Sequence, residues 1–200
     1  MTPPRFVPFF NTFVPFAAAL TAANVYAEIS PDLTFGRVIG SILVSAAFAL
    51  PACVLYAASG FASVPSTAAR YRQLLWTFAF IAYAIHYYYA VGVWFGWDFA
   101  QIYRRQRTVV AGTNNLLIVT WGIDVLFGLF GPAAGGRFVR VLRWLTHLHF
   151  MIAFFVAAVV FRSDVRTTAS LVMGVSIGLA ILFYLFRWRF RLSQEEHQVP

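Results

Sequence analysis

The sequence predicts an all-α fold: a polytopic integral membrane bundle of about six transmembrane helices. Hydrophobic residues make up 60% of the 200 residues and charged residues 11%, with a mean hydropathy of +0.72. A water-soluble domain cannot cover so much apolar surface. Apolar runs of about 20 residues, the length needed to cross about 30 Å of hydrocarbon, recur along the chain with short polar breaks. These runs are too long and too continuously apolar for barrel strands, so helices are favoured.

A single domain, residues 1–200, is expected to contain all the spans. The expected spans are approximately residues 9–27, 38–59, 74–95, 113–130, 141–161 and 168–186. Residues 187–200 are expected to form a polar C-terminal tail. Because the breaks between the runs are short, no separate soluble domain is predicted.

The first apolar run has two interpretations. A basic Arg5, an apolar stretch and small residues before Glu28 are also typical of a cleavable signal peptide. The length of the run and the prolines among the first eight residues favour a retained helix.

The distribution of arginines predicts the orientation. Six spans place both termini on one side, and the loops on that side carry more arginines than the opposite loops. The positive-inside rule therefore predicts cytoplasmic termini, in an inner or cytoplasmic membrane. The basic run Arg104, Arg105 and Arg107 would then be external. A short interfacial helix is the alternative for this segment, because it is rich in aromatic and apolar residues. These residues are Trp94, Trp97, Phe99, Ile102 and Tyr103.

The charged residues and the single cysteine exclude several classes of function. All basic residues are arginines, so chemistry that needs a lysine Schiff base is excluded. The net charge of +8 would suggest nucleic acid in a soluble protein, but these arginines lie between apolar runs, where anionic lipids are the expected partner and nucleic acid is not. Cys53 alone forms no intramolecular disulfide and no thiol-ligated metal cluster.

Small residues at a spacing of about four predict two closely packed helix faces. The second span carries Ser41, Ser45, Ala49, Cys53 and Ala57 on one face, preceded by Gly36 and Gly40. The sixth span carries Ser170, Gly174 and Gly178. We expect both faces to be buried against neighbouring helices.

Ionisable residues within the spans are the main candidates for function, because a charge at membrane depth costs about 2.5–3.5 kcal/mol. Asp124 lies about 17 Å into the fourth span at 1.5 Å per residue, near mid-bilayer. The fifth span runs in the opposite direction and brings His147 and His149 to a comparable depth. An Asp124–histidine pair that holds or relays a proton is therefore feasible. The alternative is a protonated Asp124 bonded to a hydroxyl group of the core.

His86 lies in the third span with small residues on its face, which leaves space for a planar cofactor. A mid-membrane histidine paired with one on another helix can ligate a haem, so His86 with His147 or His149 is a candidate site for a haem or chlorin. His147 and His149 point about 200° apart on their helix, so at most one of them faces His86. The alternative is a histidine that packs in the core and bonds to a tyrosine or carbonyl group.

Two polar features lie near the ends of the spans. Arg140, Arg143 and His147 form a basic stripe at the start of the fifth span, where a lipid phosphate or another anion is the expected contact. Asn114 and Asn115 begin the fourth span and are interpreted as its cap, with binding of a polar solute as the alternative.

No motif of a catalytic site or a protein-ligated metal site is found, so an enzyme is not favoured. The first expectation is a non-catalytic accessory or binding subunit of a larger membrane assembly. It rests on the 18% aromatic residues and the small-residue faces, which suit other membrane subunits or self-association. One alternative is a proton-coupled small-solute carrier or channel that uses Asp124. The other is a pigment-binding electron-transfer subunit that uses His86.

Overall fold

The computed structural model describes residues 6–58, 66–106, 108–130 and 136–155. Within these ranges all regular structure is helical and no strand occurs, which confirms the predicted all-α class. The helices are α1 (Val7–Glu28), α2 (Leu33–Ala58), α3 (Ser66–Tyr87), α4 (Phe99–Arg105), α5 (Thr108–Phe130) and α6 (Arg137–Phe155), with a π-helical segment η1 (Tyr88–Val93) continuing α3. The sixth expected span, its small-residue face and the C-terminal tail lie outside the described residues.

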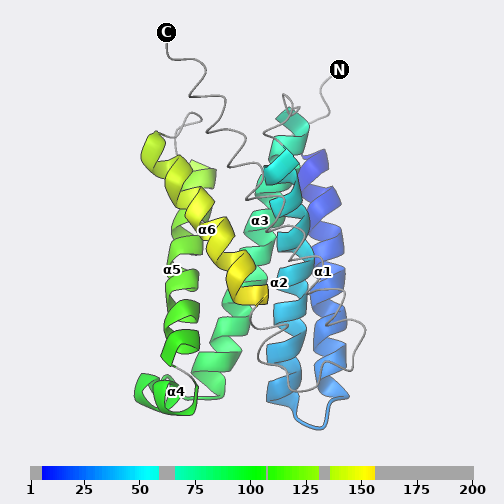
Figure 1. The fold of residues 1–200 in the computed structure, drawn as a ribbon. Coiled ribbons are helices and arrows are strands. Elements are labelled where there is room, and N and C mark those ends of the chain that lie inside the picture. The colour runs from blue at the N-terminus through cyan, green and yellow to red at the C-terminus, as the bar shows by residue number, and fades with distance from the viewer. Residues whose placement is uncertain (1–5, 59–65, 107, 131–135, 156–200) are drawn as a thin grey trace.

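Among the described residues, three helical stretches are long and apolar enough to cross a membrane. They are Leu33–Tyr56, Thr67–Val93 and Thr108–Phe130, which correspond to α2, to α3 with η1, and to α5. Figure 1 shows that α1, α3 and α6 begin at one end of the bundle, drawn at the top, whereas α2 and α5 begin at the other. The short helix α4 lies at the lower end, and α6 crosses the bundle obliquely.

The helices α1, α2 and α3 pack closely through small residues. A Cβ added to Gly36 would lie 2.8 Å from the Ala27 Cα atom, and one added to Gly40 would lie 3.0 Å from the Ala23 carbonyl oxygen. The Ser45 hydroxyl donates to the Ala79 carbonyl of α3 at 3.0 Å. The predicted burial of the second-span face is confirmed in the part of it that the structure describes: Ser41, Ser45, Ala49 and Cys53 are all buried. These contacts replace the weak hydrophobic drive between helices in lipid.

We expect Gly40→Ala to destabilise the protein by about 1–3 kcal/mol, because the new methyl group would press against the Ala23 backbone. The measurement is the free energy of unfolding of the detergent-solubilised protein. Gly112→Ala is the matched control, since its nearest neighbour is the Tyr103 hydroxyl at 4.0 Å. It should stabilise α5 by about 0.5–1 kcal/mol through helix propensity alone. Equal effects of the two variants would contradict close packing of α1 on α2.

Large aromatic side chains join α6 to the rest of the bundle. The Trp76 and Trp121 rings lie 4.5 Å apart, the Trp121 and Phe150 rings 4.9 Å, and the Phe150 and Phe154 rings 4.1 Å. These rings come from α3, α5 and α6 and are all buried. The centre of the bundle is therefore filled by aromatic groups, in contrast to the small residues between α1 and α2.

The lower end of the bundle carries the short helix α4 at the aromatic segment, where a short interfacial helix was the alternative interpretation of the sequence. Asp98 caps α4 by accepting from the Gln101 backbone N–H at 2.8 Å, and Ile102 points into the core. Before α4 the chain turns through Gly96 and Trp97, both in the left-handed region with φ of 58° and 62°. Trp97 is held there because its ring lies on Gly92, where an added Cβ would be 2.7 Å from it.

Candidate functional site

A buried carboxylate forms the centre of the candidate site. Asp124 of α5 is 1% exposed, and each of its oxygens accepts one hydrogen bond. The Trp76 indole N–H of α3 donates to Oδ2 at 2.8 Å, and the Arg143 Nε–H of α6 donates to Oδ1 at 3.0 Å. Both partners can only donate, so they match an ionised carboxylate. Among the described residues, the partners of Asp124 are thus an indole and a guanidinium and not the hydroxyl group that the alternative expected.

His147 lies beside this ion pair and between two aromatic rings. Its ring stacks on Trp76 at 4.0 Å and 7° and on Tyr56 of α2 at 4.5 Å and 19°. Two near-parallel rings this close cannot share one face, so each covers one side of the imidazole. His147 Nδ1 lies 2.7 Å from the Arg143 carbonyl oxygen, and because that oxygen only accepts, Nδ1 carries a proton.

Further charges surround His147. Asp124 and Arg72 both interact with it electrostatically, and the Arg72 guanidinium lies over the Tyr56 ring at 5.4 Å. The predicted proximity of Asp124 and His147 is therefore found. The described hydrogen bonds of the carboxylate, however, go to Trp76 and Arg143.

Two buried polar groups near the ion pair have no hydrogen-bond partner in the part of the chain that the structure describes: Trp121 Nε1 and Thr146 Oγ1. Thr146 lies three residues after Arg143 and four before Phe150, and so shares their face of α6. Arg143 contacts α5 at Asp124 and Phe150 contacts α5 at Trp121, so Thr146 faces α5 between these contacts. Both unpaired donors thus belong to the α5–α6 interface. Each costs about 1–3 kcal/mol if it stays unpaired.

The predicted basic stripe divides between the core and the surface. Arg143 turns its Nε to Asp124, while its side chain remains 24% exposed and its two terminal nitrogens make no hydrogen bond to any described residue. Arg140, one turn earlier, is exposed. His147 is buried. Arg143 therefore contacts a buried carboxylate while part of its own side chain stays exposed.

The other two histidines lie apart from this site. His86 Nδ1 lies 2.9 Å from the Val38 carbonyl oxygen of α2, so this nitrogen also carries a proton. A series of ring contacts leads from His86 to His147 through Tyr83, Trp121 and Trp76. His149 is partly buried and bonds to the backbone of Thr113. The structure thus brings Asp124, Arg143 and His147 together, but not His86 or His149.

The capping interpretation of Asn114 and Asn115 is wrong. Helix α5 begins at Thr108, so both asparagines lie inside it. Asn115 instead joins three helices: its Oδ1 accepts from the Tyr87 hydroxyl of α3 at 2.7 Å, and its amide donates to the Tyr103 hydroxyl of α4 at 3.3 Å. Helix α5 begins before the predicted span because Thr108 and Gly112 are helical although they are not strongly apolar.

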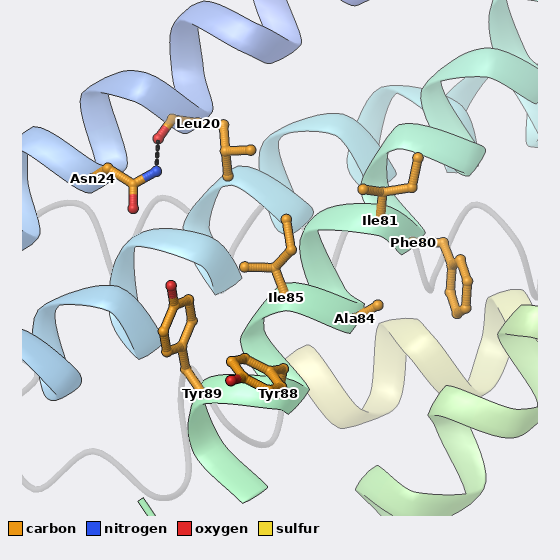
Figure 2. Close-up of a pocket in the computed structure, with 8 residues that line it drawn as sticks. All are labelled: Leu20, Asn24, Phe80, Ile81, Ala84, Ile85, Tyr88 and Tyr89. Atoms are coloured by element: carbon orange, nitrogen blue, oxygen red, sulfur yellow. Dashed lines mark hydrogen bonds between the residues drawn. The ribbon is translucent and has the colours of Figure 1, made fainter. Parts of the chain in front are cut away.

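A groove lies between α1 and α3 on the outside of the bundle (Figure 2). Its volume is about 520 Å³. The residues that line it are Leu20, Asn24, Phe80, Ile81, Ala84, Ile85, Tyr88 and Tyr89. Most of this lining is apolar, and the polar groups are the Asn24 amide and two tyrosine hydroxyls.

Trp76, Tyr56, Arg72 and Thr146 are site residues that sequence reasoning missed. One signal was present for Trp76: its indole N–H is a donor within an apolar span and needs a partner there. No signal in a single sequence shows that Tyr56 and Trp76 enclose His147, because the rotation of each helix about its axis is not encoded in spacing alone.

The class defined so far is a helical bundle with three helices able to cross a membrane and a buried charged site between α3, α5 and α6. Comparisons with family models, curated proteins and solved structures found no match to this chain. The chemistry of the site is therefore the basis for a functional assignment.

Proposed function

We propose that this chain is a multi-pass membrane protein that couples proton movement to the passage of a small solute through the Asp124 site. One observation carries the proposal: a carboxylate that is 1% exposed is shared between an arginine and an indole, with an imidazole beside it. Ionisable groups at membrane depth are costly and are characteristic of proton and substrate pathways.

The proposed cycle alternates the charge of Asp124. In the ionised state the carboxylate holds Arg143 and accepts from Trp76. A proton that arrives at Oδ1 neutralises the carboxylate, so the ion pair breaks and Arg143 is released. Loss of the proton restores the pair. His147 is close enough to take part in this exchange as a neighbouring proton carrier.

The described charges support an orientation. Five described arginines lie in the first two turns of α3 and α6, at the ends of these helices that Figure 1 draws at the top: Arg70, Arg72, Arg137, Arg140 and Arg143. Toward the lower end, the described charges are Arg37, Arg104 and Arg105 with the acidic Glu28, Asp32 and Asp98. The positive-inside rule then assigns the upper end to the cytoplasm, in an inner or cytoplasmic membrane, with arginine-rich loops in contact with anionic lipids.

Asp124→Asn is expected to abolish solute-dependent proton flux while leaving the protein folded. The amide keeps the size of the carboxylate and an acceptor for Trp76, but it cannot exchange a proton. The assay uses the full chain in vesicles with an internal pH dye, and adds the small-molecule fraction of a cell extract outside. Asp32→Asn is the control, since an asparagine can still cap α2 by accepting from Phe35. Undiminished flux through Asp124→Asn would refute the proposal.

An accessory or binding subunit is the second candidate, and the groove between α1 and α3 favours it. A mostly apolar groove of about 520 Å³ with polar groups is suited to a lipid or to a helix of another membrane subunit, including a second copy. Haem or chlorin binding by His86 with His147 or His149 stays a prediction. An absorption spectrum of the purified protein tests it.

A further inference from the structure

We infer that Arg143 binds a small oxyanion, a carboxylate or a phosphate, in exchange with Asp124. This inference names the class of solute for the proposed function. The proton coupling in the inference rests on that proposed function. Binding can be measured at equilibrium without transport, so the two proposals can fail separately.

The first observation is the incomplete pairing of the Arg143 guanidinium. A guanidinium has five N–H donors in a planar fork, and carboxylate or phosphate oxygens can accept two of them in parallel. Asp124 uses only Nε, at 3.0 Å. The terminal nitrogens make no hydrogen bond within the described residues, and the side chain is 24% exposed. Most of the donor fork is therefore available to a second anion.

The second observation is independent of Arg143. Thr146 is 1% exposed, its hydroxyl has no partner among the described residues, and it faces α5 one turn along α6 from Arg143. An unpaired buried hydroxyl is unfavourable unless a ligand or water completes it. Trp121 Nε1, also buried and unpaired, lies in the same interface. Both groups can donate hydrogen bonds to an anion, and the Trp121 indole N–H can only donate.

The electrostatic surroundings also favour an anion. The charged and titratable groups that face the site are Tyr56 of α2, Arg72 of α3 and, on α6, Arg143 and His147. Arg140 lies one turn outward on α6. Asp124 is the only carboxylate at this end among the described residues. An anion that enters from the upper end therefore meets an excess of positive charge.

Protonation of Asp124 links these features into an exchange. A proton bonds to Oδ1, the Nε–H···Oδ1 bond breaks, and Arg143 donates instead to the oxygens of the incoming anion. The site contains one anion before and after the step, because the neutral carboxyl group replaces the carboxylate. The anion therefore enters together with a proton, and it leaves when Asp124 ionises again.

Titration calorimetry on the full chain in phosphatidylcholine nanodiscs tests the inference, with inorganic phosphate and succinate as probes. At neutral pH, Asp124→Asn is expected to bind one of them about tenfold more tightly than the unchanged protein, since the competing carboxylate is gone. The unchanged protein should approach that affinity as the pH falls, whereas the affinity of the variant should vary much less. Arg143→Gln should bind neither probe. The single variant leaves the Asp124 carboxylate without its counter-charge, so the double variant Asp124→Asn with Arg143→Gln is the check. It has neither charge and should also bind neither probe.

Two single substitutions sharpen the test. Thr146→Val keeps the shape of the side chain and removes the unpaired hydroxyl, so we expect unchanged or higher stability and about fivefold weaker binding. Arg140→Gln removes the same charge as Arg143→Gln from an exposed position and should change binding about twofold.

The origin of the anion is decided by adding phosphatidylglycerol to the nanodiscs. If the lipid displaces the soluble probes from Asp124→Asn, the occupant is a lipid headgroup. If it does not displace them, the occupant is a soluble anion. Either result supports an oxyanion site.

Two outcomes would overturn the inference. One is that phosphate, succinate and phosphatidylglycerol all fail to bind Asp124→Asn. The other is equal binding with and without Arg143. Binding without any proton flux would uphold the inference and reject the transport function.

Discussion

Replacement of Arg143 by glutamine is expected to destabilise the protein by about 3–5 kcal/mol, because it leaves a buried carboxylate without its counter-charge. Asp124 is 1% exposed and would keep only the Trp76 indole as a partner. The measurement is chemical unfolding of the detergent-solubilised protein, followed by tryptophan fluorescence.

The reverse substitution provides the contrast. Asp124→Asn should cost clearly less than Arg143→Gln, because Arg143 is 24% exposed and its long side chain can turn its charge toward the headgroups. The double variant Asp124→Asn with Arg143→Gln should recover most of the loss, since neither side chain is then charged. If Arg143→Gln were no more destabilising than Asp124→Asn, the buried carboxylate would not be ionised in the folded protein.

Trp76→Ala is expected to be similarly damaging, at about 3–5 kcal/mol, because it removes a ring from the centre of the bundle. Trp76 packs on His147 at 4.0 Å, on Trp121 at 4.5 Å and on Phe150 at 5.6 Å. The side chain also supplies one of the two hydrogen bonds to Asp124. The same unfolding measurement applies, with circular dichroism in place of fluorescence.

Trp76→Phe separates the two contributions of the tryptophan. Phenylalanine keeps an aromatic ring between α3 and α6 but has no N–H group. Its loss of stability relative to the unchanged protein should be about 1.5–3 kcal/mol, the range for a hydrogen bond to a charged group. A phenylalanine variant as stable as the unchanged protein would show that the indole N–H does not stabilise the carboxylate.

The fold class was predictable because it depends on sums over many residues. The apolar runs in α2, α3 and α5 are long enough to cross a membrane, and in lipid a helix forms all backbone hydrogen bonds within its own segment. Buried helix faces were predictable where small residues recur at a spacing of four, as with Ser41, Ser45, Ala49 and Cys53. The start of α5 could not be predicted from hydrophobicity, because Thr108 and Gly112 belong to the helix without being strongly apolar.

The candidate site was predictable in depth but not in contacts. Counting residues along two helices of opposite direction placed Asp124 and His147 at one level, and the structure brings them together. Arg143 was expected to contact lipid, yet its Nε turns inward, because the carboxylate on α5 offers a counter-charge within a few ångströms. Trp76 of α3, the other hydrogen-bond partner of Asp124, could not be predicted. Its contact depends on the order of the helices in the bundle and on the rotation of each helix about its axis.

The separation of Asp124 and Arg143 on successive helices has a consequence for biogenesis. During synthesis α5 enters the membrane before α6, so its carboxylate is exposed to lipid at a cost of about 2.5–3.5 kcal/mol until the arginine arrives. Helices α1–α3 hold together through small residues and need no such partner. The nascent chain should therefore release α5 and α6 from the insertion machinery as one hairpin, so that the opposite charges meet before either faces lipid alone.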